Sequence, residues 1–413
     1  MLPLIAFHEP TPHQELAPPL TLEVAIAEAL RSHPRVARLR HELAARLQAV
    51  KGAKALTAPS ITVAPGLTSF SGTTEELLVT QPLEINGTRS ARTAIALADF
   101  HLAQAEARVT LLELAYEVRL AVLALDQAHA RLKLVETQVS DAKTLEGLAQ
   151  KQVELGTRPG IDLEQLALET LRAENLRTQA ISKVKNAEQA LNLILGRPAT
   201  NPIPGLAPLA LPPKSEPVET LLASALTLRP ELKQVAAEQE GGEAKRKLIQ
   251  AEGKPDLSPM VRVGSLFRGI PSASSGNGAG IGVSLSLPLD HGARRAQKAA
   301  IEERLEAGKS RREDVARQIE REVREAAEKL SAAQAILARY ETEALPRIER
   351  LLRASRIGFE EGKTSVLAVI EAQRTHRLIQ SDALQAHADV LLAVAALDKA
   401  RGVSLTVLPE VQP

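Results

Sequence analysis

The chain has 413 residues, and its 51 basic and 50 acidic side chains leave a formal net charge of only +1. This balance provides no basic surface for nucleic acid, and the absence of Cys excludes disulfides, thiolate metal sites and a Cys nucleophile. Aromatic residues make up 2% of the chain, while Ala, Leu and charged residues dominate, as is typical of long helices packed through small aliphatic side chains.

The N-terminal segment, residues 1–20, is expected to be extended. Its apolar run, Leu2 to Phe7, has no basic start before it and no evident cleavage site after it, so it does not resemble a secretory signal peptide. No run of 18 or more apolar residues occurs, and the sequence therefore predicts no transmembrane helix. A membrane-spanning strand needs only about ten alternating residues and is not excluded.

The two halves of the chain are similar to each other. LEVAIAEALRSHPRV, from Leu22, aligns with EPVETLLASALTLRPEL, from Glu216. Further on, TQPLEINGTRSARTA, from Thr80, aligns with SLPLDHGARRAQKAA, from Ser286. Matches that keep one order through a whole half indicate a tandem duplication. The predicted segments are the N-terminal segment (1–20), a first repeat (21–196), a Pro-rich linker (197–217), a second repeat (218–403) and a C-terminal tail (404–413).

Each repeat is predicted to begin with a helix that is followed by two short strands. In the first repeat the helix covers about 22–56, and Pro34 should break it near His33 because proline cannot donate to the preceding turn. The strands are expected within about 60–85 in the first repeat and about 257–289 in the second, with a turn-rich connector inside each pair.

The last strand shows the clearest pattern. Its apolar residues alternate with Gly and Ser, so one face is apolar and the other is small and polar; they are Ile281, Val283, Leu285 and Leu287. Such a strand suits a sheet with lipid or a core on one side and water on the other. An ordinary half-buried strand of a soluble protein would show the same alternation.

Two very long helices follow the strands in each repeat. They are expected where Pro and Gly are rare, at about 88–155, 161–195, 293–361 and 365–401. Apolar residues recur within them at three- and four-residue spacing, as in Leu111, Leu114, Val118, Val122 and Leu125. Helices of this length must pack against partners, so each half is predicted to hold a long antiparallel helical hairpin.

In this order, the elements resemble the TolC family of outer-membrane efflux proteins over residues 20–403. The matching stretches are LTLEVAIAEALRSHP, the strand-to-helix junctions QPLEINGTRSA and LPLDHGARRA, the turn EEGKTSVLAVIEAQ and the end LLAVAALDKARG. The resemblance implies a mainly α fold with short β-hairpins. Two tandem repeats per chain would supply long antiparallel helical hairpins and four strands to a trimeric 12-stranded β-barrel and an α-helical barrel. QPLEINGTR is most similar to the heavy-metal branch of the family, which includes cobalt-zinc-cadmium resistance channels.

The resemblance also implies a function and partners. The chain would form a passive homotrimeric duct in the outer membrane of a Gram-negative-type cell, in contact with outer-membrane lipid and extending into the periplasm. It would receive small molecules or metal ions from a periplasmic adaptor (membrane fusion) protein and an inner-membrane pump of the RND type. A soluble coiled-coil scaffold without a membrane role is the alternative, because no signal peptide is evident and aromatic residues are sparse.

The family's gate lies where the inner helical hairpins turn, which the resemblance places at Gly156 and at Gly362 with Thr364. Carboxylates that follow these turns often face the lumen in family members. Asp162 corresponds to one of them by position in the first repeat. In the second repeat Ala368 replaces a common Asp, while Glu371 corresponds to a further acidic position. Threefold symmetry would make each a ring of three carboxylates, which attracts cations. The helix dipole alone also favours an acid at a helix N-terminus, so a solvated helix end is the other interpretation.

The strand-to-helix junctions are expected to serve the fold. Proline would end the strand ladder by removing a donor, and glycine would allow the sharp turn into the helix. The predicted junction residues are Pro82, Gly87 and Arg89 in the first repeat and Pro288, Gly292 and Arg294 in the second.

No catalytic residue, cofactor or metal site is predicted. The chain lacks a phosphate-binding Gly loop and a nucleophile elbow, and its GNGAGIG stretch precedes a strand instead of opening a helix. His376 and His387 stand three helical turns apart, too far to share an ion, and are interpreted as surface residues.

Overall fold

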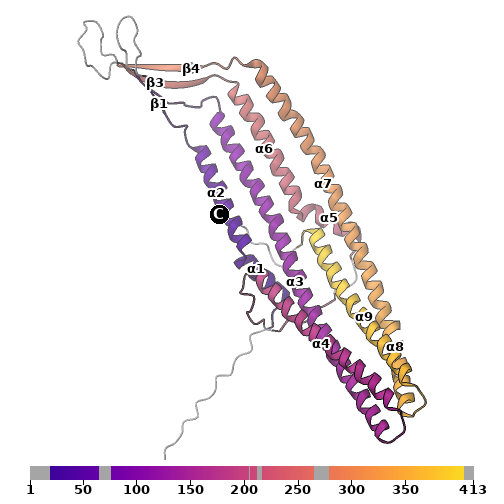
Figure 1. Cartoon of the computed structure of the whole chain (residues 1–413). Helices are drawn as coiled ribbons and strands as arrows, with labels where there is room; N and C mark the ends of the chain where they lie inside the picture. The colour runs from indigo at the N-terminus through magenta and orange to yellow at the C-terminus, as the bar shows by residue number, and fades with distance from the viewer. Residues whose placement is uncertain (1–18, 65–75, 204, 212–215, 265–278, 404–413) are drawn as a thin grey trace, which may run out of the picture. The chain divides into compact units, whose positions relative to one another are not determined.

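The computed structural model describes residues 19–64, 76–203, 205–211, 216–264 and 279–403 (Figure 1). These residues fall into two compact units, each of which takes segments from both halves of the sequence. Within the described ranges, unit 1 takes its residues from 19–34, 112–221 and 323–403, and unit 2 takes its residues from 35–111 and 222–322. Most of the predicted N-terminal segment and all of the predicted C-terminal tail lie outside the described residues, as do the connectors within the two strand pairs.

Unit 1 is a bundle of helices. Its members are α1 (Leu22–Ser32), most of α3 (Thr88–Glu154), α4 (Gly160–Ile194), the end of α7 (His291–Arg339), η1 (Tyr340–Ala344), α8 (Leu345–Glu360) and α9 (Val366–Arg401). Helix α3 lies against α4, with Val139 and Ala142 packed on Ala173. The apolar stripe predicted for α3 is confirmed, because its five residues from Leu111 to Leu125 are all buried. Among the described residues, no helix has a stretch long and apolar enough to cross a membrane.

Unit 2 combines helices with a sheet. Its helices are α2 (Pro34–Lys54), the start of α3, α6 (Pro230–Glu252) and the start of α7, and most of α5 (Val218–Leu228) belongs to it as well. Proline interrupts the first helix of each repeat at the same place, since α1 ends at Ser32 before Pro34 and α5 ends at Leu228 before Pro230. The predicted break near His33 is therefore confirmed.

The four strands form one antiparallel sheet in the order β1-β2-β3-β4. The strands are β1 (Ser60–Ala64), β2 (Glu76–Thr80), β3 (Asp256–Gly264) and β4 (Ala279–Ser286), which lie within the predicted ranges except that β3 begins one residue early. Strands β2 and β3, from different repeats, pair in the middle. Strands β1 and β4 thus lie at the edges, each with one side unpaired among the described residues.

The register of the sheet places apolar side chains on one face. One row across all four strands is Ile61, Val79, Val261 and Ile281, and the next is Val63, Leu77, Val263 and Ala279. The opposite face carries mostly small and polar residues, such as Ser258 opposite Ser284, together with Leu78 and Met260. Ile281 is 90% exposed and Val283 60% exposed, so in the described chain this apolar face is uncovered at β4.

The predicted helix at about 293–361 is not one uniform α-helix. It consists of α7, the π-helical turn η1 and α8, which begins with Pro at its second position. Pro346 has no N–H to give to the turn before it, and here the N–H of Leu345 bonds to the carbonyl of Tyr340, five residues back. Helix α3, which contains no proline, runs unbroken for 67 residues.

Candidate functional site

The two hairpin turns of unit 1 are built in the same way. Gly156 follows α3 with φ +70°, and Gly362 follows α8 with φ +72°. The N–H groups of Thr157 and Lys363 bond back to the carbonyls of Gln152 and Gly358, which is the Schellman pattern that ends helices. A left-handed φ disfavours any residue with a Cβ, so glycine is required at both turns.

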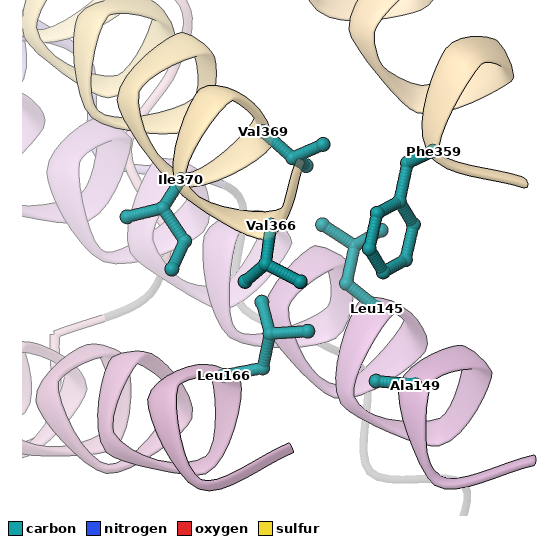
Figure 2. Packing of buried hydrophobic residues seen from close by; sticks show 7 residues of the cluster. All are labelled: Leu145, Ala149, Leu166, Phe359, Val366, Val369 and Ile370. Carbon is teal, nitrogen blue, oxygen red and sulfur yellow. The ribbon is translucent and has the colours of Figure 1, made fainter. Parts of the chain in front are cut away.

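A buried apolar cluster joins the two hairpins just inside these turns (Figure 2). Phe359 from α8 is fully buried, and the other members come from α3, α4 and α9. They are Leu145, Ala149, Leu166, Val366, Val369 and Ile370. Because one continuous cluster contains residues from both hairpins, separating the hairpins would expose Phe359 and its neighbours to water.

Arg158, in the first turn, binds the second turn directly. Its Nη2 donates to the carbonyl of Phe359 and to the carbonyl of Thr364, each at 3.1 Å. The guanidinium carbon lies 4.1 Å from the centroid of the Phe359 ring, a cation–π contact. Nη1 reaches the Asp162 carboxylate at 3.3 Å, and the Arg158 side chain is only 11% exposed. One arginine thus connects the ends of both hairpins.

Gly358, near the end of α8, leaves room for the Thr364 side chain of the second turn. A Cβ at Gly358 would overlap the hydroxyl of Thr364 and come within 3.2 Å of the Thr364 Cβ. The N–H of Thr364 donates to the Gly358 carbonyl at 3.0 Å. Thr364, which the sequence assigned to this turn, therefore packs against the last turn of its own hairpin, and only glycine leaves room for it.

A second polar contact between the hairpins lies farther along α4 and α9. The Glu169 carboxylate on α4 is 5% exposed and receives Arg374 at 2.7 Å and Arg377 at 2.9 Å, both from α9. Arg172 adds a third partner at 2.7 Å. Burial alone would raise the pKa of Glu169, but the hydrogen bonds and charges of Arg374 and Arg377 outweigh it and hold the pKa below its ordinary 4.5.

The two predicted lumen carboxylates lie in different environments. Asp162 is in the first turn of α4, is 19% exposed and is paired with Arg158. Glu371 is 58% exposed and lies 3.0 Å from Nη1 of Arg374, which it shares with Glu169. Each acid thus has an arginine partner within the chain, and the rings of three remain a prediction.

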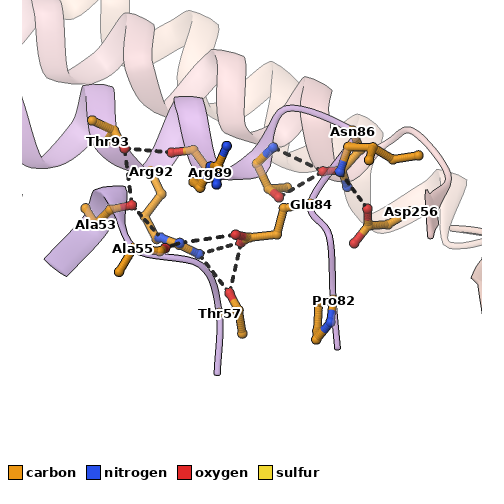
Figure 3. Close-up of polar contacts among 12 residues, drawn as sticks. Ala53, Ala55, Thr57, Pro82, Glu84, Asn86, Arg89, Arg92, Thr93 and Asp256 are labelled. Carbon is orange, nitrogen blue, oxygen red and sulfur yellow. Dashed lines mark hydrogen bonds and ion pairs between the residues drawn. The ribbon is translucent and has the colours of Figure 1, made fainter. Parts of the chain in front are cut away.

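A separate polar site fixes the first strand-to-helix junction in unit 2 (Figure 3). Glu84 has a left-handed backbone conformation, with φ 54°. The two Nη atoms of Arg92 donate to its two carboxylate oxygens at 2.6 and 3.3 Å. Arg92 also donates to the carbonyls of Ala53 and Ala55, at the end of α2. The conformation of Glu84, unfavourable for a residue with a Cβ, is thus held by a bidentate ion pair.

The three residues predicted to shape the first junction differ in their structural roles. Gly87 has φ +92°, which requires glycine. Pro82 does not end the pairing with β3, since the N–H groups of Gln81 and Leu83 on either side of it bond to β3 carbonyls, so its missing donor faces β1. The structure places Arg89 on the exposed surface and gives the anchoring contacts to Arg92 instead.

The second junction is simpler. Strand β4 ends at Ser286, two residues before Pro288. Gly292 lies in the first turn of α7, outside the left-handed region, and a Cβ there would meet no atom within 4 Å, so the predicted need for glycine is not found. Arg294 pairs with Asp290, four residues earlier.

Four of these residues were not singled out by the sequence: Arg92, Arg158, Glu169 and Gly358. Their main partners lie on other helices or turns, and the local signals are the Arg158–Asp162 pair at i, i+4 and the Glu169–Arg172 pair at i, i+3. His376, interpreted as a surface residue, is half-buried, and this burial lowers its pKa. In the described ranges, no group of three His, Cys, Asp or Glu residues could hold a metal ion.

The fold is shared with solved structures of outer-membrane channels. One is the open state of the outer membrane channel MtrE of Neisseria gonorrhoeae, with a TM-score of 0.73 at 16% identity over 93% of this chain and 89% of that one. Another is a membrane protein from Pseudomonas aeruginosa, with a TM-score of 0.76 at 20% identity over 93% of this chain and 90% of that one. The chain thus shares the fold of these two membrane proteins.

The sequence comparison defines the family. The model of the outer membrane efflux protein family matches residues 25–197 and 221–403, and the chain belongs to that family. It is also similar to the cobalt-zinc-cadmium resistance protein CzcC of Cupriavidus metallidurans, with 28% identity over 88% of this chain and 85% of the relative. This family consists of transport channels. Membership in it does not favour the soluble scaffold that was the alternative from the sequence.

Proposed function

We propose that the chain is the outer-membrane channel of a tripartite efflux system and works as a passive homotrimeric duct. The observation that carries the proposal is the match of the efflux family over both halves of the chain. Energy for transport would come from an inner-membrane pump of the RND type. A periplasmic adaptor would connect that pump to the duct, whose cargo would be metal ions or other small molecules.

The sheet supports assembly from several copies. Its two edge strands, β1 and β4, each have an unpaired side in the described chain, and unpaired edges are unfavourable in lipid. Three copies would bring twelve strands together and allow the sheet to close. The exposed apolar face, with Val261, Ile281 and Val283, would then face lipid, and the small polar face would line the water-filled path.

The two turns of unit 1 are the proposed gate. In the described state, Arg158 and the Phe359 cluster join the hairpin ends, while Glu169 joins α4 to α9. Opening would require α8 and α9 to move relative to α3 and α4, which breaks these contacts. The π-helical turn before Pro346 is where the α7–α8 helix would bend most easily, since its hydrogen bonding is already irregular there.

The cargo is proposed to include heavy-metal cations. Support comes from the similarity to a protein named for cobalt, zinc and cadmium resistance, and from the predicted carboxylate rings at Asp162 and Glu371. A duct needs only to let its cargo pass, so the side chains act through charge in the lumen, without a dedicated binding site.

Single-channel recording tests the proposal. Protein exported with a signal sequence and purified in detergent should insert into planar lipid bilayers and give discrete conductance steps. Cross-linking in the membrane should give trimers. A protein that stays monomeric and never conducts in lipid would overturn the duct. Deletion in the native host should raise sensitivity to the cargo, with the adaptor and pump genes left intact.

A further inference from the structure

A pocket lies in unit 1 between α3, α4 and α9, separate from the proposed gate. Its volume is about 440 Å³. Arg131 of α3 and Lys183 of α4 line it together with Ser381 and Gln385 of α9, and alanines supply most of the remaining wall. The volume is within the range of pockets that bind small organic ligands.

The lining of this pocket has positive charge and no carboxylate. Neither cation has an acidic residue at the helical positions that would neutralise it. Those positions, three and four residues away, are Gln127, Ala128, Leu134 and Val135 around Arg131, and Gln179, Ala180, Asn186 and Ala187 around Lys183. The pocket thus presents two positive charges that its own walls do not balance.

Two other cations of the same helices have carboxylate partners. Lys143 of α3 lies 2.7 Å from Glu174, and Arg177 of α4 lies 3.7 Å from Glu136. Arg131 and Lys183 differ from these two in that they face one pocket whose lining contains no carboxylate.

Hydrogen bonds hold the polar wall in place. Nη1 of half-buried Arg131 donates to the hydroxyl of Ser381. The Gln127 amide donates to the side-chain oxygen of Gln385 at 2.7 Å, which links α3 to α9. Arg131 is therefore oriented by Ser381, and its remaining donors have no carboxylate partner among the residues that line the pocket. A guanidinium held in this way suits the two oxygens of an anionic group.

An apolar pocket adjoins the basic one. It has a volume of about 350 Å³, and Ala124, Gln127 and Leu384 line both. The rest of its wall is mainly Leu and Ala, with Asp126 and His387 as its two ionisable residues. We infer that the two pockets together form a binding site for an organic anion, whose carboxylate, sulfonate or phosphate group lies between Arg131 and Lys183 and whose apolar part extends toward Leu384.

Binding of naphthalene-1-sulfonate tests the site, with the trimer in lipid nanodiscs and isothermal titration calorimetry as the readout. The matched cation 1-naphthylmethylammonium controls for the apolar part, and empty nanodiscs control for lipid. The sulfonate should bind measurably tighter than the ammonium. Arg131→Gln and Lys183→Gln should each weaken sulfonate binding about tenfold, which is the effect of losing one charge-assisted hydrogen bond.

Lys185→Gln is the matched control, because Lys185 is an exposed cation of α4 outside the pocket lining. It should bind the sulfonate like the parent protein. Equal binding by all variants, or equal binding of the two probes, would overturn the site. Loss of the trimer in Arg131→Gln and Lys183→Gln would overturn it too, by assigning the pocket to an interface between copies. Conductance is measured separately, so failure of the duct proposal would be recognised independently.

Discussion

Arg158, in the first hairpin turn, and Phe359, near the end of α8, are 201 residues apart, yet the Arg158 guanidinium stacks on the Phe359 ring at 4.1 Å and donates to the Phe359 carbonyl at 3.1 Å. A planar guanidinium can stack on the ring with its face while its edge N–H groups donate, a geometry that a compact ammonium does not offer. The contact joins the two hairpin ends that the proposed gate has to separate.

Replacing Arg158 with Gln should therefore favour the open state. The change removes a cation–π contact and two hydrogen bonds to carbonyls, together worth about 2–3 kcal/mol. We expect a higher open probability in single-channel recordings, with Arg158→Lys intermediate. Arg353→Gln, at an exposed position of α8, is the control and should leave gating unchanged. Closed-state behaviour like that of the parent protein in Arg158→Gln would show that this contact does not hold the gate.

Glu169 should make the gate sensitive to acid. Its pKa in the folded protein is below 4.5, so the ionised form stabilises the α4–α9 contact above about pH 4.5, and this contribution is lost as the pH falls through the folded value. The protection factors of amides in the first turns of α9, which correct for the intrinsic slowing of exchange in acid, should fall at low pH. In Glu169→Gln, the free energy of protection of these amides should be lower by about 1–3 kcal/mol at neutral pH. The protection should also respond less to acid. An unchanged acid response in this variant would contradict the assignment.

Gly358→Ala should destabilise the second turn by about 1–3 kcal/mol, because the added Cβ overlaps the Thr364 hydroxyl. Thr364→Ala should relieve part of this cost, so the double variant should lose less than the sum of the single ones in thermal unfolding. Gly147→Ala is the control, because a Cβ at Gly147, inside α3, would meet no atom within 4 Å. Alanine there should raise the free energy of unfolding by up to about 1 kcal/mol. Strictly additive losses would disprove the contact.

At the first junction, Arg92→Gln and Arg89→Gln form a matched pair. Arg92 clasps Glu84, whereas Arg89 is exposed. The Arg92 variant should lose about 2–3 kcal/mol of unfolding free energy, as expected when a bidentate ion pair is broken at a strained backbone position. The Arg89 variant should stay within about 0.5 kcal/mol of the parent. Equal losses in the two variants would contradict this division of roles.

Glu371→Gln should lower the preference of the channel for cations, measured as the reversal potential in a salt gradient. In a trimer the change removes three negative charges, and it leaves Arg374 with Glu169 as its remaining partner. Glu360→Gln, an exposed acid at the end of α8, serves as the control. A reversal potential unaffected by Glu371→Gln would place this carboxylate outside the ion path.

The sequence by itself determined the local features of this protein. Proline marks the helix breaks at Pro34 and Pro230, glycine marks the turns at Gly156 and Gly362, and the apolar stripe of α3 is buried as its spacing predicts. These features could be predicted because each depends on the backbone of one residue or on the period of one helix.

Only the tertiary structure decided which polar residues act together. Glu169 meets Arg374 across 205 positions of sequence, and Arg92, not Arg89, meets Glu84. Whether a side chain three residues farther along a helix points to a partner or to solvent depends on how that helix is rotated against its neighbours. Helical periodicity limits this rotation but does not identify the neighbour, so the charged contacts of the two hairpin ends and of the junction appear only when the helices are packed.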